Sequence, residues 1–212
     1  MEESIPSSLS WENDFMKKYQ SISFIAGTLS ILDYLAFTLI AYSRYPLPYS
    51  PIRNWLSDLG SANLNPHGAI FYNAGIITTA LLLMLFFLGL SNWKIENKKV
   101  QNIMLRLAQV FGILGSFCMI MSAVFPINLL NVHSFWSAAL YIMLSTAFVF
   151  SVASLRYHQN VPRWLLVLGI STAVIVIMTS FMTTVYVLEW ITLFLFLSYV
   201  GVLSIETRRL KV

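Results

Sequence analysis

The chain has 212 residues, of which 58% are hydrophobic and only 10% are charged, and its formal net charge is +4. Soluble domains average about 45–50% apolar and about 25% charged residues, so an ordinary soluble domain is excluded. Apolar runs of about 18 residues recur without strand-like alternation, which excludes a β-barrel and predicts an all-α polytopic membrane bundle. The basic residues lie beside these runs, where anionic lipid headgroups are met, and we therefore exclude nucleic acid as a partner.

Six transmembrane segments are expected, because about 20 helical residues cross a hydrocarbon core of about 30 Å. They cover residues 22–42, 69–90, 103–125, 133–155, 164–184 and 188–205. Residues 1–20 then form an N-terminal tail, 21–206 a single membrane domain and 207–212 a C-terminal tail. The first run exceeds the roughly 7–15 apolar residues of a signal peptide, so we expect it to be retained.

Within the first segment, Asp33 is the acidic residue nearest the middle of a span. A charge at that depth costs about 2.5–3.5 kcal/mol on insertion scales, so Asp33 is expected to face the bundle interior. Three roles stay open for it. It is a hydrogen-bonded or protonated structural residue, a proton or ion relay, or a ligand contact.

The first connecting loop, residues 44–66, contains the signals of a short helix. Ser50-Pro51 is a cap followed by a first-turn proline, Gly60 is a stop, and apolar residues recur between them at helical spacing. We expect an amphipathic helix lying in the outer membrane interface, with Arg53, Asn54, Ser57 and Asp58 on its polar side. Asn65-Pro66 repeats the cap signal and is expected to start the second span.

Lys and Arg are distributed unevenly between alternate loops. The two tails, the second loop and the fourth loop hold eleven of them, which are Lys17, Lys18, Lys94, Lys98, Lys99, Arg106, Arg156, Arg163, Arg208, Arg209 and Lys211. Only Arg44 and Arg53 fall on the other side. Because basic residues near span ends are retained in the cytoplasm, both termini are predicted to be cytoplasmic in a multi-pass protein of the cell membrane.

Polar residues gather at the outer helix ends. His133 opens the fourth span and Glu189 the sixth, while Asp58 and His67 lie in the first outer loop. If the helices form an ordinary bundle, these four side chains approach one another in an outward-facing pocket. Asn73, inside the second span, is expected to line the pocket floor, since a buried amide needs a partner.

Each of these residues also has a structural interpretation. Asp58 is placed to bond local backbone N–H groups at the end of a short helix, and His133 to donate to a loop carbonyl. Histidine and carboxylates together suit zinc, but the HxxxH or HExxH spacing of a strong zinc motif is missing, so the metal stays unassigned and zinc is an alternative. Arg53 is placed for a salt bridge or a phosphate contact.

The motif Ser50-Pro51-x-x-Asn54-x-x-Ser57-Asp58-Leu59-Gly60, followed by Asn65-Pro66 and Phe71-x-Asn73-x-Gly75, resembles an uncharacterised prokaryotic family of six-helix membrane proteins, a domain of unknown function. Val124-Phe125-Pro126 with His133 is similar to the outer turn and histidine of that family, and Glu189 to its acidic residue before the last helix. The family usually has Arg after that acid, where this chain has Trp190.

A more distant likeness is to DRAM-type and GPI-anchor lipid-remodelling membrane proteins, which implies lipid handling at the non-cytoplasmic face. The leading functional hypothesis is recognition or remodelling of a membrane lipid or lipid-linked molecule. Its proposed catalytic residues are Asp58, His133 and Glu189, and its proposed ligand-binding residues are Arg53, Asn54, Ser57, Asn65, His67 and Asn73. The alternatives are a non-catalytic structural or partner-binding protein and a small transporter that uses Asp33. Enzyme and non-enzyme stay open, because no unmistakable nucleophile is present.

Overall fold

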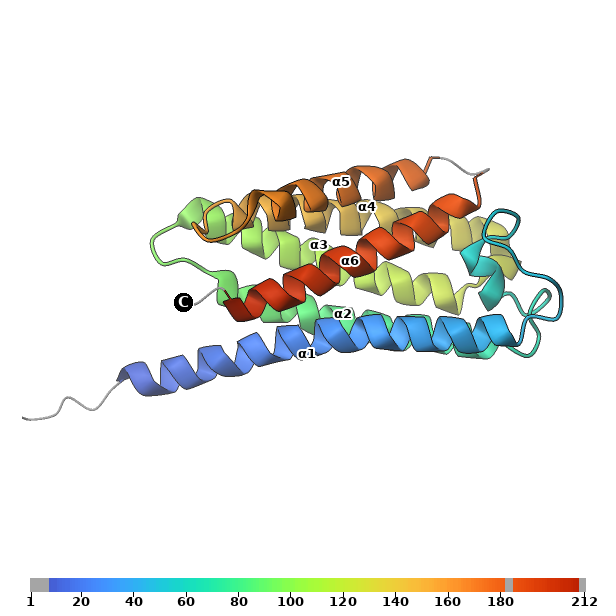
Figure 1. Cartoon of the computed structure of the whole chain (residues 1–212), viewed down its shortest axis with the longest axis horizontal. Helices are drawn as coiled ribbons and strands as arrows, with labels where there is room; N and C mark the ends of the chain where they lie inside the picture. Colours follow the sequence, from blue (N-terminus) through green and yellow to red (C-terminus); the bar gives the residue numbers. More distant parts are fainter. Residues whose placement is uncertain (1–7, 182–184, 210–212) are drawn as a thin grey trace, which may run out of the picture.

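The computed structural model describes residues 8–181 and 185–209, with side chains from residue 22 onward. Six α-helices lie side by side along the long axis of the molecule (Figure 1). They are α1 (Ser8–Ser43), α2 (Ala69–Gly89), α3 (Lys99–Val124), α4 (Leu130–Leu155), α5 (Arg163–Thr179) and α6 (Val187–Arg209). Short 3-10 helices η1 (Leu56–Gly60), η2 (Leu90–Trp93) and η3 (Ile127–Leu129) lie in the connections. The predicted all-α bundle is confirmed.

The helices agree with the predicted spans, with differences at their ends. Five of the described segments are long and apolar enough to cross a membrane, and the chain is therefore a multi-pass membrane protein by length and composition. The helix α5 is apolar but has only 17 residues. Residues 182–184 of the predicted fifth span lie outside the described residues. The helix α1 begins at Ser8, well before the predicted start of the first span, and projects beyond the bundle (Figure 1).

The core is built by α1 packed on α2, α3 packed on α4, and α6 packed against both α1 and α5. Its largest fully buried side chains are aromatic, including Phe86, Phe87, Phe148 and Tyr199. The Tyr199 hydroxyl lies 2.8 Å from Ser151 Oγ, so a polar group inside the bundle has a partner on a neighbouring helix. These contacts fix the helices that carry the polar residues described below.

Asp33 lies half-buried between α1 and α2. Its Oδ2 accepts hydrogen bonds from Thr78 Oγ1 at 2.6 Å and Thr79 Oγ1 at 2.8 Å. The two threonines satisfy one carboxyl oxygen within the helix pair. This geometry supports the structural role among the three that the sequence left open.

The two ends of the bundle differ in composition. The C-terminal end of α6, the α2–α3 connection and the α4–α5 connection lie at one end, while η1, the α3–α4 connection and the facing ends of α5 and α6 lie at the other (Figure 1). We call the first the terminal end and the second the η1 end. The basic residues of the second and fourth loops belong to the terminal end, and Arg53 belongs to the η1 end.

The first loop departs from the prediction of an amphipathic interfacial helix over residues 50–60. Residues 50–54 form a turn in which Ser50 O accepts from the N–H groups of Arg53 and Asn54 at 2.9 and 2.8 Å. Only Leu56–Gly60 is helical, as a single 3-10 segment. Side chains three residues apart eclipse in a 3-10 helix, so Leu56 and Leu59 are buried together against the bundle. The segment therefore packs its two leucines against the helices and is not an amphipathic α-helix over residues 50–60.

The side chains of Asn65 and Asn73 attach η1 to the neighbouring helices. Asn65 Nδ2 donates to Ala41 O at 3.1 Å and to Leu59 O at 2.9 Å, so its side chain joins α1 to η1 and does not cap α2, where Gly68 occupies the cap position. Gly60 allows a close approach to α2, because a β-carbon there would stand 2.5 Å from Asn73 Oδ1. The Gly60 carbonyl in turn accepts from Asn73 Nδ2 at 3.0 Å.

Candidate functional site

A cavity of about 110 Å³ lies at the η1 end, and all six helices and η1 contribute to its wall. Its polar lining residues are Tyr34, Ser57, Tyr72, Asn73, Ser122, His133, Ser137, Tyr141, Glu189 and Thr192. Leucine, isoleucine, valine, methionine, phenylalanine, alanine and proline side chains complete the wall. An apolar cavity of about 150 Å³ holds one benzene molecule, so this space suits a chemical group of a few heavy atoms and not an entire lipid.

His133 is held in one orientation by backbone carbonyls. Its Nδ1 lies 2.9 Å from Phe125 O and 3.0 Å from Ser122 O, both at the C-terminal end of α3. A carbonyl oxygen only accepts, so Nδ1 carries the proton. In the neutral imidazole Nε2 is consequently an acceptor, and it lies 3.3 Å from Ser137 Oγ on the next turn of α4. The helix is interrupted at Pro126 and η3, and the chain turns there so that the last carbonyls of α3 lie beside the first turn of α4.

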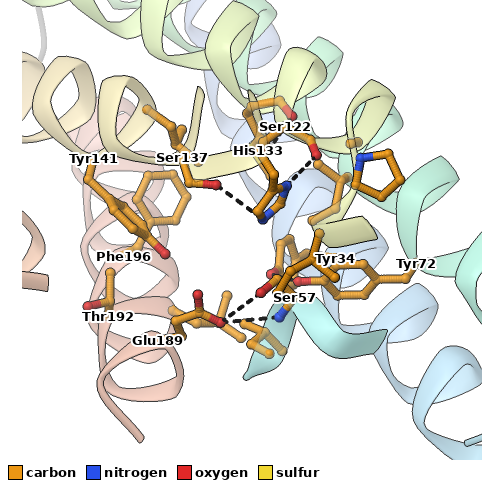
Figure 2. A pocket seen from close by; sticks show the side chains of 18 of the residues that line it. Tyr34, Ser57, Tyr72, Ser122, His133, Ser137, Tyr141, Glu189, Thr192 and Phe196 are labelled. Atoms are coloured by element: carbon orange, nitrogen blue, oxygen red, sulfur yellow. Dashed lines mark hydrogen bonds between the residues drawn. The ribbon is translucent and has the colours of Figure 1, made fainter. Parts of the chain in front are cut away.

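Glu189, in the first turn of α6, lies across the open centre of the cavity from His133 (Figure 2). Its Oε2 accepts from Ser57 N at 3.1 Å and from Ser57 Oγ at 3.4 Å. These bonds connect α6 to η1 over 132 positions of sequence. The other carboxyl oxygen, Oε1, is turned toward the cavity (Figure 2).

Tyrosines form much of the remaining polar wall. The hydroxyls of Tyr34 and Tyr72 lie 3.2 Å apart at the α1–α2 side. Tyr141 lies two turns beyond His133 on α4, and its hydroxyl points into the cavity (Figure 2). Asn73 reaches the wall as predicted, but its Nδ2 is used by the Gly60 carbonyl.

Asp58 is buried directly behind this wall and is not one of its lining residues. Its Oδ2 accepts from Trp55 N at 3.0 Å, which caps the start of η1. Burial raises the pKa of the Asp58 carboxyl, while hydrogen bonds from Trp55 N–H and the Asn54 side chain act in the opposite direction. Asn54 also accepts from Ser50 N at 3.1 Å. Both residues shape the segment that presents Ser57.

Three other predicted site residues stand away from the cavity wall. Arg53 is exposed on the turn before η1, and His67 is exposed before α2. In the described part of the chain the one salt bridge joins Glu206 to Arg209, so the expected pairing of Arg53 with Asp58 or Glu189 is not formed. Asn65 is buried between α1 and η1. The expected meeting of four side chains is thus reduced to His133 and Glu189, with Asp58 behind them and His67 outside.

The sequence prediction missed six polar wall residues, which are Tyr34, Tyr72, Ser122, Ser137, Tyr141 and Thr192. The signal for the last three is helical spacing, because Ser137 and Tyr141 follow His133 at four and eight positions and Thr192 follows Glu189 at three. Residues at these intervals share a helix face, so the two candidate residues mark the faces that line the cavity.

Trp190 replaces the arginine expected after the acidic residue. Its indole Nε1 donates to Tyr49 Oη at 3.3 Å, and Tyr49 Oη donates to Trp55 O at 2.7 Å. The rings of Tyr49 and Trp190 also make an edge contact, with their centroids 6.1 Å apart. The substitution therefore ties the first loop to α6 by an aromatic contact near the cavity.

Residues 28–205 match the family described as "Protein of unknown function (DUF998)". The chain belongs to the DUF998 family. No curated protein and no solved structure matches it. The DUF998 match begins inside α1 and ends inside α6, and so includes every wall residue of the cavity.

The donor set of this DUF998 cavity does not favour the zinc alternative. Zinc sites use at least three protein ligands. Among the side chains that the structure describes, no three His, Cys, Asp or Glu residues come together to hold a metal ion. His133 and Glu189 alone supply two protein ligands, fewer than a zinc site needs.

Proposed function

We propose that this DUF998 protein binds a membrane lipid or lipid-linked molecule, with part of the headgroup inside the cavity at the η1 end. One observation carries the proposal. A bundle of membrane-type helices encloses a space with His133 and Glu189 on facing walls, instead of filling that space with apolar side chains. Intramembrane and interfacial ionisable residues are costly, and they commonly mark ligand or ion sites.

The cavity is proposed to face the extracytoplasmic side of the cell membrane. Eleven of the 13 Lys and Arg residues belong to the tails or to the loops at the terminal end. The positive-inside rule then places that end, with both termini, in the cytoplasm. A ligand would reach the cavity from the outer leaflet.

The proposed roles follow the positions of the side chains. His133 and Glu189 contact the ligand and form the acid–base pair if the lipid is remodelled as well as bound. Arg53, exposed on the turn before η1, is available for an anionic phosphate outside the cavity. Asp58 acts through η1, because it holds the backbone that presents Ser57 to Glu189.

The second candidate is a non-catalytic structural or partner-binding protein. It is favoured by the hydrogen bonds of two residues that do not line the cavity: Asp58 bonds within the first loop, and Asn65 attaches that loop to α1. Under this candidate, changes in the cavity alter stability and leave lipid retention unchanged. The small-transporter alternative has less support, since both threonine bonds to Asp33 fix it between two helices.

The proposal is tested by filling the cavity. Ser137→Leu places a larger apolar side chain in the wall beside His133, whereas Ser134→Leu makes the same change at an exposed position on α4. Lipids retained by purified protein are identified by native mass spectrometry. We expect S137L to lose a specific lipid that wild type and S134L retain. Equal retention by all three proteins would contradict ligand binding in this cavity.

A further inference from the structure

The hydrogen bonds around the cavity have a fixed direction, which defines the chemistry of what it accepts. Phe125 O and Ser122 O only accept, so His133 donates from Nδ1. Neutral His133 then accepts at Nε2, and the Ser137 hydroxyl is its donor. Ser137 Oγ, with its own proton so used, offers lone pairs to the cavity.

The opposite wall also offers an acceptor. Ser57 donates twice to Glu189 Oε2, and Glu189 Oε1 is turned to the open centre (Figure 2). Beside a bound cation Glu189 is an ionised carboxylate, which accepts at both oxygens and donates at neither. Ser137 Oγ and Glu189 Oε1 therefore face each other as acceptors, beside the Tyr141 hydroxyl, which can take either role.

The described cavity wall contains one carboxyl group, from Glu189, and no Lys or Arg side chain. No Lys or Arg is present between Arg106 and Arg156, nor between Arg163 and Arg208, so α4 and the cavity-bearing parts of α3, α5 and α6 bring no cation. Arg44, on the first loop, lies over the Phe71 ring with its guanidinium carbon 4.4 Å from the centroid. An anionic group inside the cavity would thus meet Glu189 without a compensating cation on the wall.

We propose that the cavity recognises a primary ammonium group, of the kind carried by an aminoalcohol lipid headgroup. An ammonium has three N–H donors and no acceptor, which matches facing acceptors on two walls, and its positive charge complements Glu189. A group of this size fits a space of about 110 Å³. This inference rests on the proposed function for its source, a lipid, and free aminoalcohols share the same chemistry.

The lipid source is tested by a methylation series on the full chain. Dioleoyl phosphatidylethanolamine, its N-methyl and N,N-dimethyl forms and phosphatidylcholine keep one glycerophosphate and remove N–H donors stepwise. Relative occupancy by native mass spectrometry is expected to fall along the series, by about tenfold overall, the effect of one charge-assisted hydrogen bond. Equal occupancy along the series, or preference for phosphatidylglycerol, would overturn the ammonium inference using wild-type protein alone.

Paired variants locate the preference. Glu189→Gln removes the charge at nearly unchanged shape and is expected to bring the tenfold difference below about twofold. Glu206→Gln changes the same residue type at the other end of α6, where Glu206 is paired with Arg209 at 3.0 Å, and is expected to keep the preference. Retention of the full preference in E189Q would also overturn the assignment to this cavity.

Free ethanolamine separates this inference from the proposed function. If millimolar ethanolamine raises the unfolding temperature of wild type but not of E189Q, while no lipid is lost from S137L, the ammonium site stands and its lipid source fails. If S137L loses lipids of every headgroup equally, the lipid site stands and ammonium recognition fails.

Discussion

The two ends of the bundle each contain a histidine bonded to backbone carbonyls, yet one end is packed and the other is hollow. At the terminal end His158 Nε2 lies 3.0 Å from Trp93 O, and Gln101 Nε2 donates to the same carbonyl at 2.7 Å and to Ser154 Oγ at 2.9 Å. Trp93, Gln101 and Ser154 are fully buried. At the η1 end His133 has comparable bonds, but it and Glu189 stay half-buried around open space.

The difference shows how a polar cluster that holds helices together can be told from a polar cluster that can bind a ligand. In the terminal cluster, which is Trp93, Gln101, Ser154 and His158, hydrogen bonds join Trp93 O, Gln101 and Ser154 inside the core, and the Trp93 indole Nε1 is left without a partner among the described residues. In the η1 cavity the backbone and Ser57 hold His133 and Glu189 from behind, and their remaining acceptor atoms face inward. The candidate site is marked by a cavity whose polar wall atoms have hydrogen-bonding positions left for a ligand, and not by the presence of a histidine.

The largest predicted effect comes from one substitution made at both ends of α4. Ser154→Leu overpacks the terminal cluster and removes the acceptor for Gln101, and we expect a loss of about 3 kcal/mol in the free energy of unfolding. Ser137→Leu loses the hydrogen bond to His133 Nε2 but places its side chain in empty space, and we expect a loss of about 1 kcal/mol. Unfolding curves in detergent measure both. Similar losses in the two variants would remove the distinction between packed and hollow ends.

The next effect concerns Gln101 itself. Gln101→Leu leaves buried partners without their donor and acceptor and is expected to cost about 2 kcal/mol. Gln109→Leu is the matched control, because Gln109 lies on the same helix and also donates to backbone carbonyls but is only half-buried. The same unfolding assay should show a loss at least twice as large for Q101L. A greater loss for Q109L would be inconsistent with a stabilising role for the terminal cluster.

A smaller effect is expected at the capping residue of the η1 end. Asp58→Ala removes the acceptor for Trp55 N and should lower the free energy of unfolding by about 1 kcal/mol, as for other lost helix caps. Because Asp58 lies behind the wall, the lipid retained in native mass spectra should stay the same as in wild type. Loss of the lipid without loss of stability would instead give Asp58 a direct role in binding.

The smallest effect is the pH dependence of the terminal cluster. Burial lowers the pKa of His158 below its ordinary value of 6.5, although the Trp93 carbonyl acts in the opposite direction. A lowered pKa contributes stability above the unfolded value, and this contribution is lost as pH falls through the folded value. Unfolding temperatures should therefore decrease below about pH 6.5.

The His158 contribution is isolated by two variants. His158→Gln keeps an N–H donor for Trp93 O without a titrating ring, and should flatten the decrease below about pH 6.5. His67→Gln, at an exposed position, should leave the decrease unchanged. An unchanged slope in H158Q would show that the dependence has another origin.

Much of the fold was predictable from the sequence because the membrane imposes it. Long apolar runs of about 20 residues have to be helices, since backbone groups in lipid must be satisfied within the segment. The helix ends were less predictable. Ser8 starts α1 far before its apolar run, and the proline at position 51 starts a turn and not a helix. Leu56 and Leu59 then select a 3-10 segment because both become buried against the bundle.

The candidate site was predictable only in part. His133, Glu189, Ser57 and Asn73 line the cavity as expected, while Arg53, Asn54, Asp58, Asn65 and His67 do not. The helical phase of His133 points to Ser137 and Tyr141, but no local pattern says whether a loop residue such as His67 turns inward or outward. That orientation depends on contacts between segments far apart in the chain.

The sequence by itself determined the helices, their number and the unequal distribution of basic residues, because these depend on hydrophobic length and local charge. Only the tertiary structure decided which polar side chains share a space. The bond from Ser57 to Glu189 spans 132 positions, and the bonds from His133 to the α3 carbonyls depend on how α4 turns back on α3. Such contacts are set by the packing of whole helices, which no single segment encodes.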